Sequence, residues 1–499
     1  MATEPAIKSP LLRPTVDRRR NERQERSRDP FTIGAWLLVA VGVLGVALVV
    51  VLASGMRPGY DAFGWMVWGK QVLHWNLNTD GAPSWKPLPF LFTLPYALFG
   101  AGQVWLWMVT AVGGALAGCV FAARIAYMLT GPCARRPYAP YVAGAVAGVG
   151  LLGLDTYSHL VLIASSDPII VTLCLAAIDC HLSERPKLAF AMLVLASLGR
   201  PEAWPFLALY AIWAWFRVPA MRVLAVVGLA VIPAFWFIIP ALTSKSWFIS
   251  GNLALRTINA VNVIHGSKFV AILDRLRLLN GWPIEVAAVI GFVIAAVRRD
   301  LVALALVAAG CLWTAIEIGL ALHGWSGANR YLLEPAAVAI VIAGYAAGRV
   351  LAFAPQPQRD HGALRTASVV GSIFLVALLV GSLIPTGKRR VSTARSDITE
   401  ARFAGRQIVR LQGVIAKDGG ASEIRSCGQP VTLVGLQSKL AWAVGLNVGN
   451  VGFRPGKSID SGKPIVFFKP HLNGWEVRPI HIAKADASRC AALRRDSAF

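Results

Sequence analysis

The sequence predicts an all-α polytopic membrane bundle of about eleven transmembrane helices, followed by a small extracytoplasmic α/β domain. Three observations support this prediction. Hydrophobic residues make up 56% of the 499 residues and charged residues 15%, whereas soluble domains usually carry about 25% charged residues. The apolar residues form long blocks, and residues 33–53 carry no charge and are long enough to cross a hydrocarbon core of about 30 Å. After Pro385 the composition changes to that of a soluble domain.

Helices are expected throughout the apolar blocks, because a helix satisfies its backbone hydrogen bonds internally, as lipid requires. The two short segments within 187–217 are also compatible with one broken pair that dips into the membrane. The expected spans are 33–53, 104–130, 139–155, 167–183, 187–200, 202–217, 222–242, 282–297, 301–322, 331–352 and 367–385.

The net charge of +23 does not indicate nucleic-acid binding, since the basic residues lie in short loops and in two tails. Residues 1–30 are polar and rich in arginine, which predicts a disordered basic cytoplasmic tail rather than a cleaved signal peptide. With this tail inside, the inner segments hold 19 Lys and Arg residues and the outer loops hold 10. This bias predicts a multi-pass protein of the plasma (inner) membrane, with the N-terminus in the cytoplasm and the C-terminal domain outside.

The membrane domain is expected to cover 31–385, with two long outer loops at 54–103 and 243–281. The first loop contains four tryptophans and the second contains Trp247, and tryptophan suits segments that are partly buried at the membrane interface.

Residues 386–499 are predicted to form the extracytoplasmic α/β domain, with a helix near 396–415, strands near 430–435 and 464–468, and a helix near 438–446. Cys427 and Cys490 both lie in this polar region. They can form a disulfide if the domain is outside the cytoplasm, and they are two free thiols otherwise.

Two carboxylates are candidate catalytic groups. Asp61 follows the first span in the segment Gly59–Trp65, and a carboxylate at the membrane surface can serve as a general base. Asp167 lies between Ser166 and Pro168 at a predicted helix start on the same side of the membrane. The alternatives are a solvated aspartate or a helix N-cap for Asp61, and a helix cap for Asp167.

Arginines at the outer ends of spans are candidates for binding a lipid phosphate, because a charge at this depth normally faces a cavity or a partner. Arg330 has the fork geometry that suits a phosphate, and Arg200 can bind phosphate or pair with Glu202. Arg256 and Lys268, in the second long loop, can add to this anion site. The scattered histidines and cysteines show no metal-binding spacing.

Taken together, these motifs resemble those of the GT-C glycosyltransferases, in the bacterial branch related to protein O-mannosyltransferases and lipid A aminoarabinose transferases. The resemblance covers about 55–335, and the rich content of Ala, Arg and Trp is similar to that of actinobacterial members. The motifs that carry it, in order along the chain, are Gly59-Tyr60-Asp61, Lys86-Pro87-Leu88, Ser166-Asp167-Pro168, Arg200-Pro201-Glu202 and Arg330-Tyr331. One Asp stands where many relatives have an adjacent acidic pair, which disfavours a divalent metal because a lone carboxylate is a poor cation site.

This resemblance implies inverting sugar transfer from a polyprenyl-phosphate donor to a cell-envelope acceptor, which is a glycan, a glycolipid or a protein. It implies that Asp61 or Asp167 is the base, and that Arg330, with Arg256, Arg200 or Lys268, binds the donor phosphate. Acceptor or sugar contacts are expected from the first loop and its end, at Tyr60, Trp65, Trp68 and Lys86. No cofactor and no nucleic acid are expected.

Two other classes of function are considered. A transporter or flippase for lipid-linked saccharides would be expected to show inverted repeats, which the sequence lacks. A non-catalytic membrane partner of an envelope complex would tolerate loss of Asp61 and Arg330. The sequence does not specify the sugar, the acceptor, the chain length of the lipid or the oligomeric state.

Overall fold

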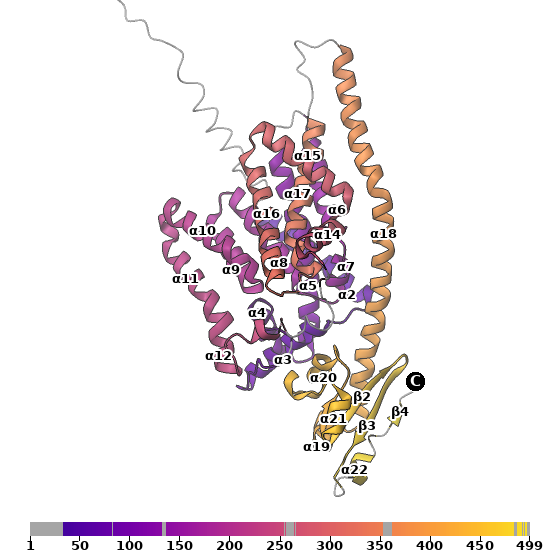
Figure 1. The fold of residues 1–499 in the computed structure, drawn as a ribbon. Helices are drawn as coiled ribbons and strands as arrows, with labels where there is room; N and C mark the ends of the chain where they lie inside the picture. The colour runs from indigo at the N-terminus through magenta and orange to yellow at the C-terminus, as the bar shows by residue number, and fades with distance from the viewer. Residues whose placement is uncertain are drawn as a thin grey trace, which may run out of the picture.

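A bundle of α-helices makes up most of the chain, and a small sheet lies beyond one end of it (Figure 1). The computed structural model describes residues 33–81, 83–131, 136–253, 255, 264, 266–352, 362–483, 487–491, 493 and 495–496. The predicted tail 1–30 and the candidate Arg256 lie outside the described residues.

Each predicted span other than 367–385 coincides, within a few residues, with a helix or a run of adjoining helices. From the N-terminal side, the helices of the bundle are α2 (Ile33–Ser54), α3 (Tyr60–Leu73), α4 (Pro87–Tyr96), η1 (Ala97–Phe99), α5 (Gly102–Thr130), α6 (Ala139–Leu152), α7 (Tyr157–Leu162), α8 (Asp167–Leu182) and α9 (Pro186–Gly199). They continue with η3 (Pro201–Ala203), α10 (Trp204–Arg217), η4 (Pro219–Met221), α11 (Arg222–Pro233), η5 (Ala234–Ile238), α12 (Ile239–Thr243), α14 (Lys268–Asn280), α15 (Trp282–Arg298), α16 (Leu301–Leu322), η6 (Asn329–Leu332), α17 (Leu333–Ala352) and α18 (Gly362–Lys417).

Five helical segments among the described residues are long and apolar enough to cross a membrane. They are Ile33–Ser54, Gly102–Thr130, Pro219–Thr243, Leu301–Leu322 and Asn329–Ala352. The pair α14 and α15, which is bent by 100°, adds a sixth segment if the two helices count as one broken span. Several other predicted spans are shorter, such as the 14-residue helices α9 and α10. At 1.5 Å per residue such a helix is about 21 Å long, less than the hydrocarbon core, so the count of about eleven spans stays a prediction.

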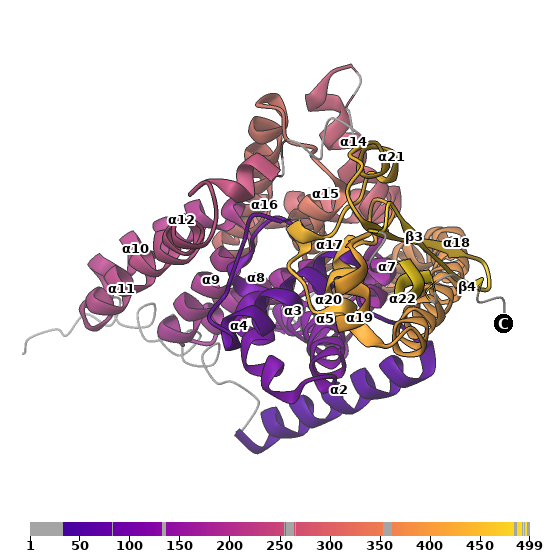
Figure 2. The same cartoon turned by 90° about the horizontal axis from the view of Figure 1, so that it is seen from below.

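Helices at the edge of the bundle expose apolar side chains, and helices at its centre bury them. Helix α2 lies along one edge (Figure 2), and only 17% of its apolar 18-residue stretch is buried. In the segment Asn329–Ala352, which contains α17, 83% of the corresponding stretch is buried. Helix α17 packs closely on α6, because Gly344 lacks a side chain: a Cβ atom there would lie 2.6 Å from the carbonyl oxygen of Ala143. Small residues that allow such backbone approach are typical of helix contacts in membranes.

A single long helix joins the bundle to the C-terminal domain. Helix α18 has 56 residues, which corresponds to about 84 Å, and it runs along the side of the bundle (Figure 1). The predicted span 367–385 and the predicted helix 396–415 are both parts of it. The expectation of separate elements was wrong because Pro385 does not end the helix. The predicted boundary at 386 therefore falls inside α18.

The C-terminal domain contains a four-stranded sheet in the order β1-β2-β3-β4. β1 (Gln429–Val431) pairs in parallel with β2 (Ile465–His471), whereas β3 (Gly474–Ile480) pairs antiparallel with β2 and with β4 (Arg495–Asp496). The strand predicted near 464–468 is confirmed as β2, and the helix predicted near 438–446 is α20 (Gln437–Val444). The strand predicted near 430–435 overlaps β1 only at residues 430–431, because β1 ends at Val431. The remaining elements are α19 (Gly420–Cys427), η7 (Val448–Asn450), α21 (Pro455–Asp460) and α22 (Ala487–Ala491).

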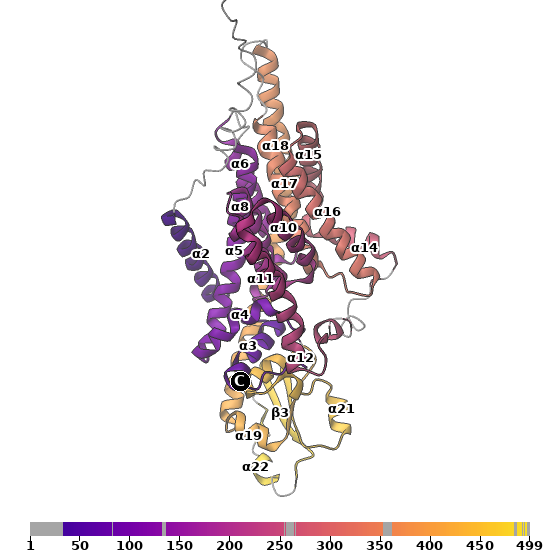
Figure 3. The same cartoon turned by 90° about the vertical axis from the view of Figure 1, so that its left-hand side faces the viewer.

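The C-terminal domain packs against the first long loop (Figure 3). The Ser438 hydroxyl donates to the carbonyl oxygen of Tyr60 at 2.6 Å. Trp442 packs on Phe63, with 5.5 Å between ring centroids. These contacts join α20 to the first turns of α3, so the domain lies on the same side of the bundle as the first loop. Orientation in the membrane stays a prediction.

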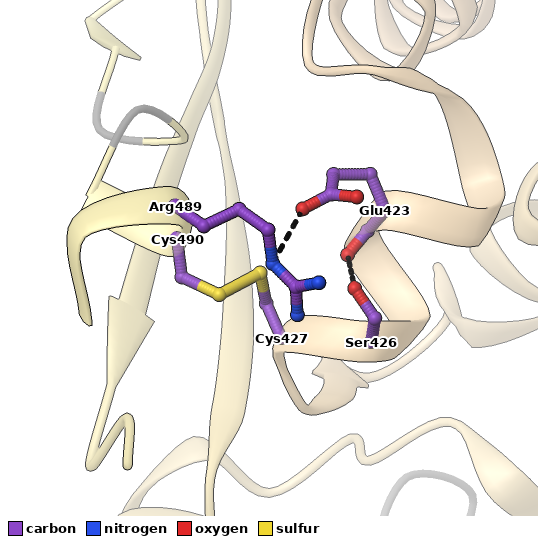
Figure 4. Close-up of a disulfide and its surroundings, with 5 residues drawn as sticks. All are labelled: Glu423, Ser426, Cys427, Arg489 and Cys490. Carbon is purple, nitrogen blue, oxygen red and sulfur yellow. Dashed lines mark hydrogen bonds and ion pairs between the residues drawn. A yellow bond between two sulfur atoms is a disulfide. The ribbon is translucent and has the colours of Figure 1, made fainter. Parts of the chain in front are cut away.

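Cys427, at the end of α19, is joined by a disulfide to Cys490 in α22 (Figure 4). The same two helices are also held by an ion pair of 3.0 Å between Arg489 Nε and Glu423 Oε1. Both cysteines are buried and lie 63 positions apart in the sequence, and the segment between them contains the strands β1 to β3.

Replacing Cys427 by Ser should destabilise the C-terminal domain. Opening a covalent loop of this length is expected to cost about 4 kcal/mol of unfolding free energy. Hydrogen exchange of β2 and β3 in the full chain should speed up, and a reducing agent should have the same effect on the unmutated protein. The matched control is Cys311→Ser, which removes an exposed free thiol in the bundle. Equal exchange in both variants would mean that the disulfide does not stabilise the sheet.

Candidate functional site

A cavity of about 470 Å³ lies where the first loop meets η3 and η6. It collects residues that are far apart in the sequence. Those that lie in the predicted motifs are Tyr60, Asp61, Lys86, Arg200, Pro201, Glu202, Arg330 and Tyr331, and the predicted contact residue Trp65 lines the cavity as well. The other lining residues include Trp85, Thr156, Leu160, Trp236, Ser250, Trp325 and Asn329. Residues of four of the five motifs thus line one cavity, and Asp167 of the fifth motif lies directly behind it, where it contacts Lys86 and Arg200.

Asp61 and Arg330 form the accessible ion pair of this cavity. Their Oδ2 and Nη1 atoms lie 3.2 Å apart, and the side chains are 31% and 35% exposed. Arg330 also donates from Nη2 to the Tyr331 hydroxyl at 3.3 Å. A carboxylate and a guanidinium that both reach solvent can engage a substrate, whereas fully buried groups cannot.

The position of Asp61 follows from how α3 begins. Gly59 is in an extended conformation, and its N–H donates to the carbonyl oxygen of Ile163 at 2.7 Å. This bond ties the start of α3 to the end of α7. Asp61 then lies in the first turn of α3, where the helix dipole stabilises a negative charge.

Arg200 is the centre of a buried charge network behind the cavity. Its Nη2 atom lies 2.6 Å from Asp167 Oδ1 and donates to the carbonyl oxygen of Arg330, also at 2.6 Å. Its Nε atom lies 3.4 Å from Glu334 Oε1. Only 2% of the Arg200 side chain is exposed. Arg200 therefore joins the start of α8 to η6 and α17, and it holds the backbone of Arg330.

Asp167 is fully buried and is surrounded by groups that stabilise its charge. Lys86 Nζ lies 3.4 Å from Oδ1, and the Ser165 hydroxyl donates to Oδ2 at 2.7 Å. Asp167 is the first residue of α8 and not its cap, because the N-cap position is Ser166. The alternative that Asp167 is the N-cap residue of this helix is thus wrong. Its carboxylate instead holds Lys86 and Arg200 in place.

Two buried glutamates near Arg200 were not among the candidates. Glu334, in the first turn of α17, pairs with Arg200, and Glu317 of α16 is 1% exposed. An acidic residue within an apolar span is a signal of function or of a buried partner, and this signal was present in the sequence. Glu202, which was expected to pair with Arg200, lies 4.0 Å from it.

The predicted aromatic contacts divide into two groups. Tyr60 and Trp65 line the cavity, and the ammonium group of Lys86 lies 5.9 Å from the Trp65 ring centroid. Trp68 does not line it, because it is fully buried and packs on Trp85 at 5.1 Å. Trp85 itself lines the cavity and donates to the carbonyl oxygen of Phe235 at 2.9 Å. The tryptophans of this loop were expected to be partly buried, but Trp75 is 97% exposed.

Lys268, expected in the anion site, starts α14 and is not among the residues that line the cavity. A group of three residues with metal-ligand chemistry occurs elsewhere, between α7 and α18. The ligand atoms of His159, Asp397 and Glu400 lie within 4.8 Å of one another. Since 238 residues separate His159 from Asp397, no local spacing in the sequence could reveal this group.

The sequence matches no protein-family model and no curated protein. The solved structures that are similar to this chain include two of one protein. A crystal structure of ArnT from Cupriavidus metallidurans in the apo state has 14% sequence identity and a TM-score of 0.48, and the match covers 92% of this chain and 94% of that chain. A crystal structure of the same protein bound to undecaprenyl phosphate has 14% identity and a TM-score of 0.46, and the match covers 93% and 96%.

Proposed function

We propose that this chain is a membrane glycosyltransferase that moves a sugar from a polyprenyl-phosphate donor to an extracytoplasmic acceptor. One observation carries the proposal: Asp61 and Arg330, which are 269 residues apart in sequence, meet at 3.2 Å in a cavity that also holds Lys86, Tyr60 and Trp65. A carboxylate, two cations and aromatic faces are the groups that sugar transfer from a phosphate requires.

Asp61 is proposed as the general base. The acceptor O–H loses its proton to this carboxylate, and the oxygen forms a bond to the anomeric carbon as the bond from that carbon to the phosphate oxygen breaks. A single displacement inverts the anomeric configuration. Asp61 suits this role better than Asp167, because it is 31% exposed whereas Asp167 is fully buried.

Arg330 is proposed to bind the donor phosphate. Arg330 pairs with Asp61, and a phosphate that binds the guanidinium instead would release the carboxylate to act as a base. The leaving group is already an anion, so no general acid is needed. Lys86, half-buried between Asp167 and Trp65, is close enough to add a second positive charge.

Arg200 and Asp167 are proposed as positioning residues. Arg200 holds the carbonyl oxygen of Arg330, and Asp167 holds both Arg200 and Lys86. Their side chains are buried and paired with each other, so they act on the reaction through Arg330 and Lys86 rather than by touching the sugar.

A second cavity suits the lipid part of the donor. It has a volume of about 520 Å³ and lies between α8, α9, α10, α16 and α17, with mostly apolar lining residues such as Leu175, Phe206 and Val338. Glu334, which pairs with Arg200, also lines it. The two cavities thus lie next to the same charge network, and an isoprenoid chain in the second would place its phosphate toward the first.

The decisive experiment incubates the purified full chain with a panel of radiolabelled polyprenyl-phosphate hexoses and pentoses and with envelope glycans, glycolipids and proteins. Transfer of label to one acceptor class would support the proposal. If no donor were consumed, and unlabelled polyprenyl phosphate did not bind either, the proposal would fail.

Asp61→Asn should reduce the transfer rate at least about 100-fold, because the amide cannot accept the acceptor proton. The thermal stability of the protein should stay close to that of the unmutated chain, since the carboxylate is partly exposed. The matched control is Asp274→Asn, which removes an exposed carboxylate of α14. Full activity in Asp61→Asn would disprove the assignment of the base.

Arg330→Lys should weaken transfer by about tenfold, and Arg330→Gln by about 100-fold, because lysine keeps the charge but not the two-pronged geometry. Both variants should also bind polyprenyl phosphate more weakly in a direct binding assay. Arg277→Lys, at an exposed position of α14, is the control. Unchanged phosphate binding in Arg330→Gln would rule out Arg330 as the phosphate ligand.

Asp167→Asn should differ from Asp61→Asn by destabilising the protein. Neutralising this carboxylate leaves Arg200 without its closest acidic partner and should cost about 3 kcal/mol of unfolding free energy. A lower thermal midpoint together with lost activity is expected. A variant that folds with normal stability and loses only turnover would instead indicate that Asp167 takes part in the chemistry.

A further inference from the structure

A second basic pocket lies where α18 passes the C-terminal end of α2. It has a volume of about 460 Å³ and is separate from the cavity around Asp61. Its lining residues are Leu52, Ala53, Gly55, Arg57, Arg402, Gly405, Arg406, Val409 and Arg410. Four of the nine residues are arginines, and none is acidic.

The arginines gather here for two structural reasons. Arg402, Arg406 and Arg410 are four residues apart, so they follow one face of α18. The helix can approach the end of α2 closely because Gly405 has no side chain: a Cβ atom there would lie 2.4 Å from the carbonyl oxygen of Gly55. This contact brings Arg57, which follows α2, to the arginine face of α18.

The hydrogen bonds found for these arginines go to neutral acceptors. Arg402 donates from Nε to the carbonyl oxygen of Ser54 at 3.2 Å and from Nη2 to that of Ala53 at 3.0 Å. Arg57 and Arg410 each donate one bond to a carbonyl oxygen, at 2.9 and 3.2 Å. Each guanidinium has five N–H donors, so several remain available for an anion.

Carbonyl groups hold the arginines but do not cancel their charges. Burial lowers the pKa of the Arg57 guanidinium, which is the effect of moving a cation out of water without a carboxylate partner. Like charges around one pocket repel each other, and a bound anion would relieve that repulsion. The pocket therefore has the electrostatics of an anion site.

The side chains of α2 beside the pocket indicate which kind of molecule carries the anion. Leu52, which lines the pocket, is 60% exposed, and Leu48 and Val49 on the preceding turn are exposed too. This helix is long and apolar enough to cross a membrane, so these side chains face lipid. An anion at the end of α2 is thus at the level of the lipid headgroups.

We propose that this arginine pocket binds the phosphate headgroup of an anionic membrane lipid whose acyl chains lie along α2. The bound lipid would join α2 to α18 and so hold the helix that carries the C-terminal domain at the membrane surface. The proposal does not depend on the glycosyltransferase function.

Native mass spectrometry of the full chain in detergent tests it with two lipids that have the same acyl chains, phosphatidylglycerol and phosphatidylcholine. The test variant is Arg406→Gln, since Arg406 is exposed and makes no hydrogen bond or ion pair within the described part of the chain. The control is Arg395→Gln, which removes the same charge from an exposed position of α18 outside the pocket. A third arm adds a large excess of inorganic phosphate.

We expect phosphatidylglycerol to bind more tightly than phosphatidylcholine, and Arg406→Gln to weaken its binding about fivefold while Arg395→Gln leaves it unchanged. Inorganic phosphate should not displace the lipid. Equal binding of the two lipids, or equal effects of the two substitutions, would overturn the proposal. Displacement by inorganic phosphate would overturn it as well, because the pocket would then be a site for free anions.

Discussion

The buried guanidinium of Arg200 is the interaction on which the arrangement of the candidate site depends. A cation inside an apolar helix bundle is stable only if acidic partners compensate for the lost hydration. Asp167 and Glu334 do so, and the carbonyl oxygen of Arg330 accepts a further bond. Because these partners come from α8, α17 and η6, the need to satisfy one charge determines how three segments meet.

This network separates two kinds of charged residue. Asp167 and Arg200 are buried and paired, which fixes their positions but removes them from contact with a substrate. Asp61 and Arg330 line the cavity next to these buried residues, and their side chains remain about one-third exposed. Buried groups that hold an accessible carboxylate and guanidinium in position suit the proposed reaction, since these two groups are then oriented before a substrate binds.

The C-terminal domain is connected to the same region by two routes. The long helix α18 passes the end of α2 at the arginine pocket, and α20 contacts the first turns of α3 close to Asp61. The segment that carries Asp61 is therefore held between α7 of the bundle and the C-terminal domain. The domain thus supports the position of the proposed base in addition to its own fold.

The sequence by itself determined the helical bundle, the approximate positions of most helices within the predicted spans, and the strand β2, whereas it did not locate α3, α4, α7 and α14 between those spans. These features follow from local patterns: apolar blocks of membrane-spanning length, and runs of β-forming residues between turns. It also identified Asp61, Asp167, Arg200 and Arg330 as candidates, because a charge at the end of an apolar segment is costly and needs a reason.

Only the tertiary structure decided which of these charges are accessible. Burial of Asp167, exposure of Asp61 and the packing of Trp68 on Trp85 depend on segments more than ten residues away in each case. The continuity of α18 through Pro385, the partnership of Glu334 with Arg200 and the arginine pocket were likewise absent from the local patterns. The physical reason is that hydrophobic periodicity acts along one helix, whereas burial and charge pairing arise only when helices distant in sequence come into contact.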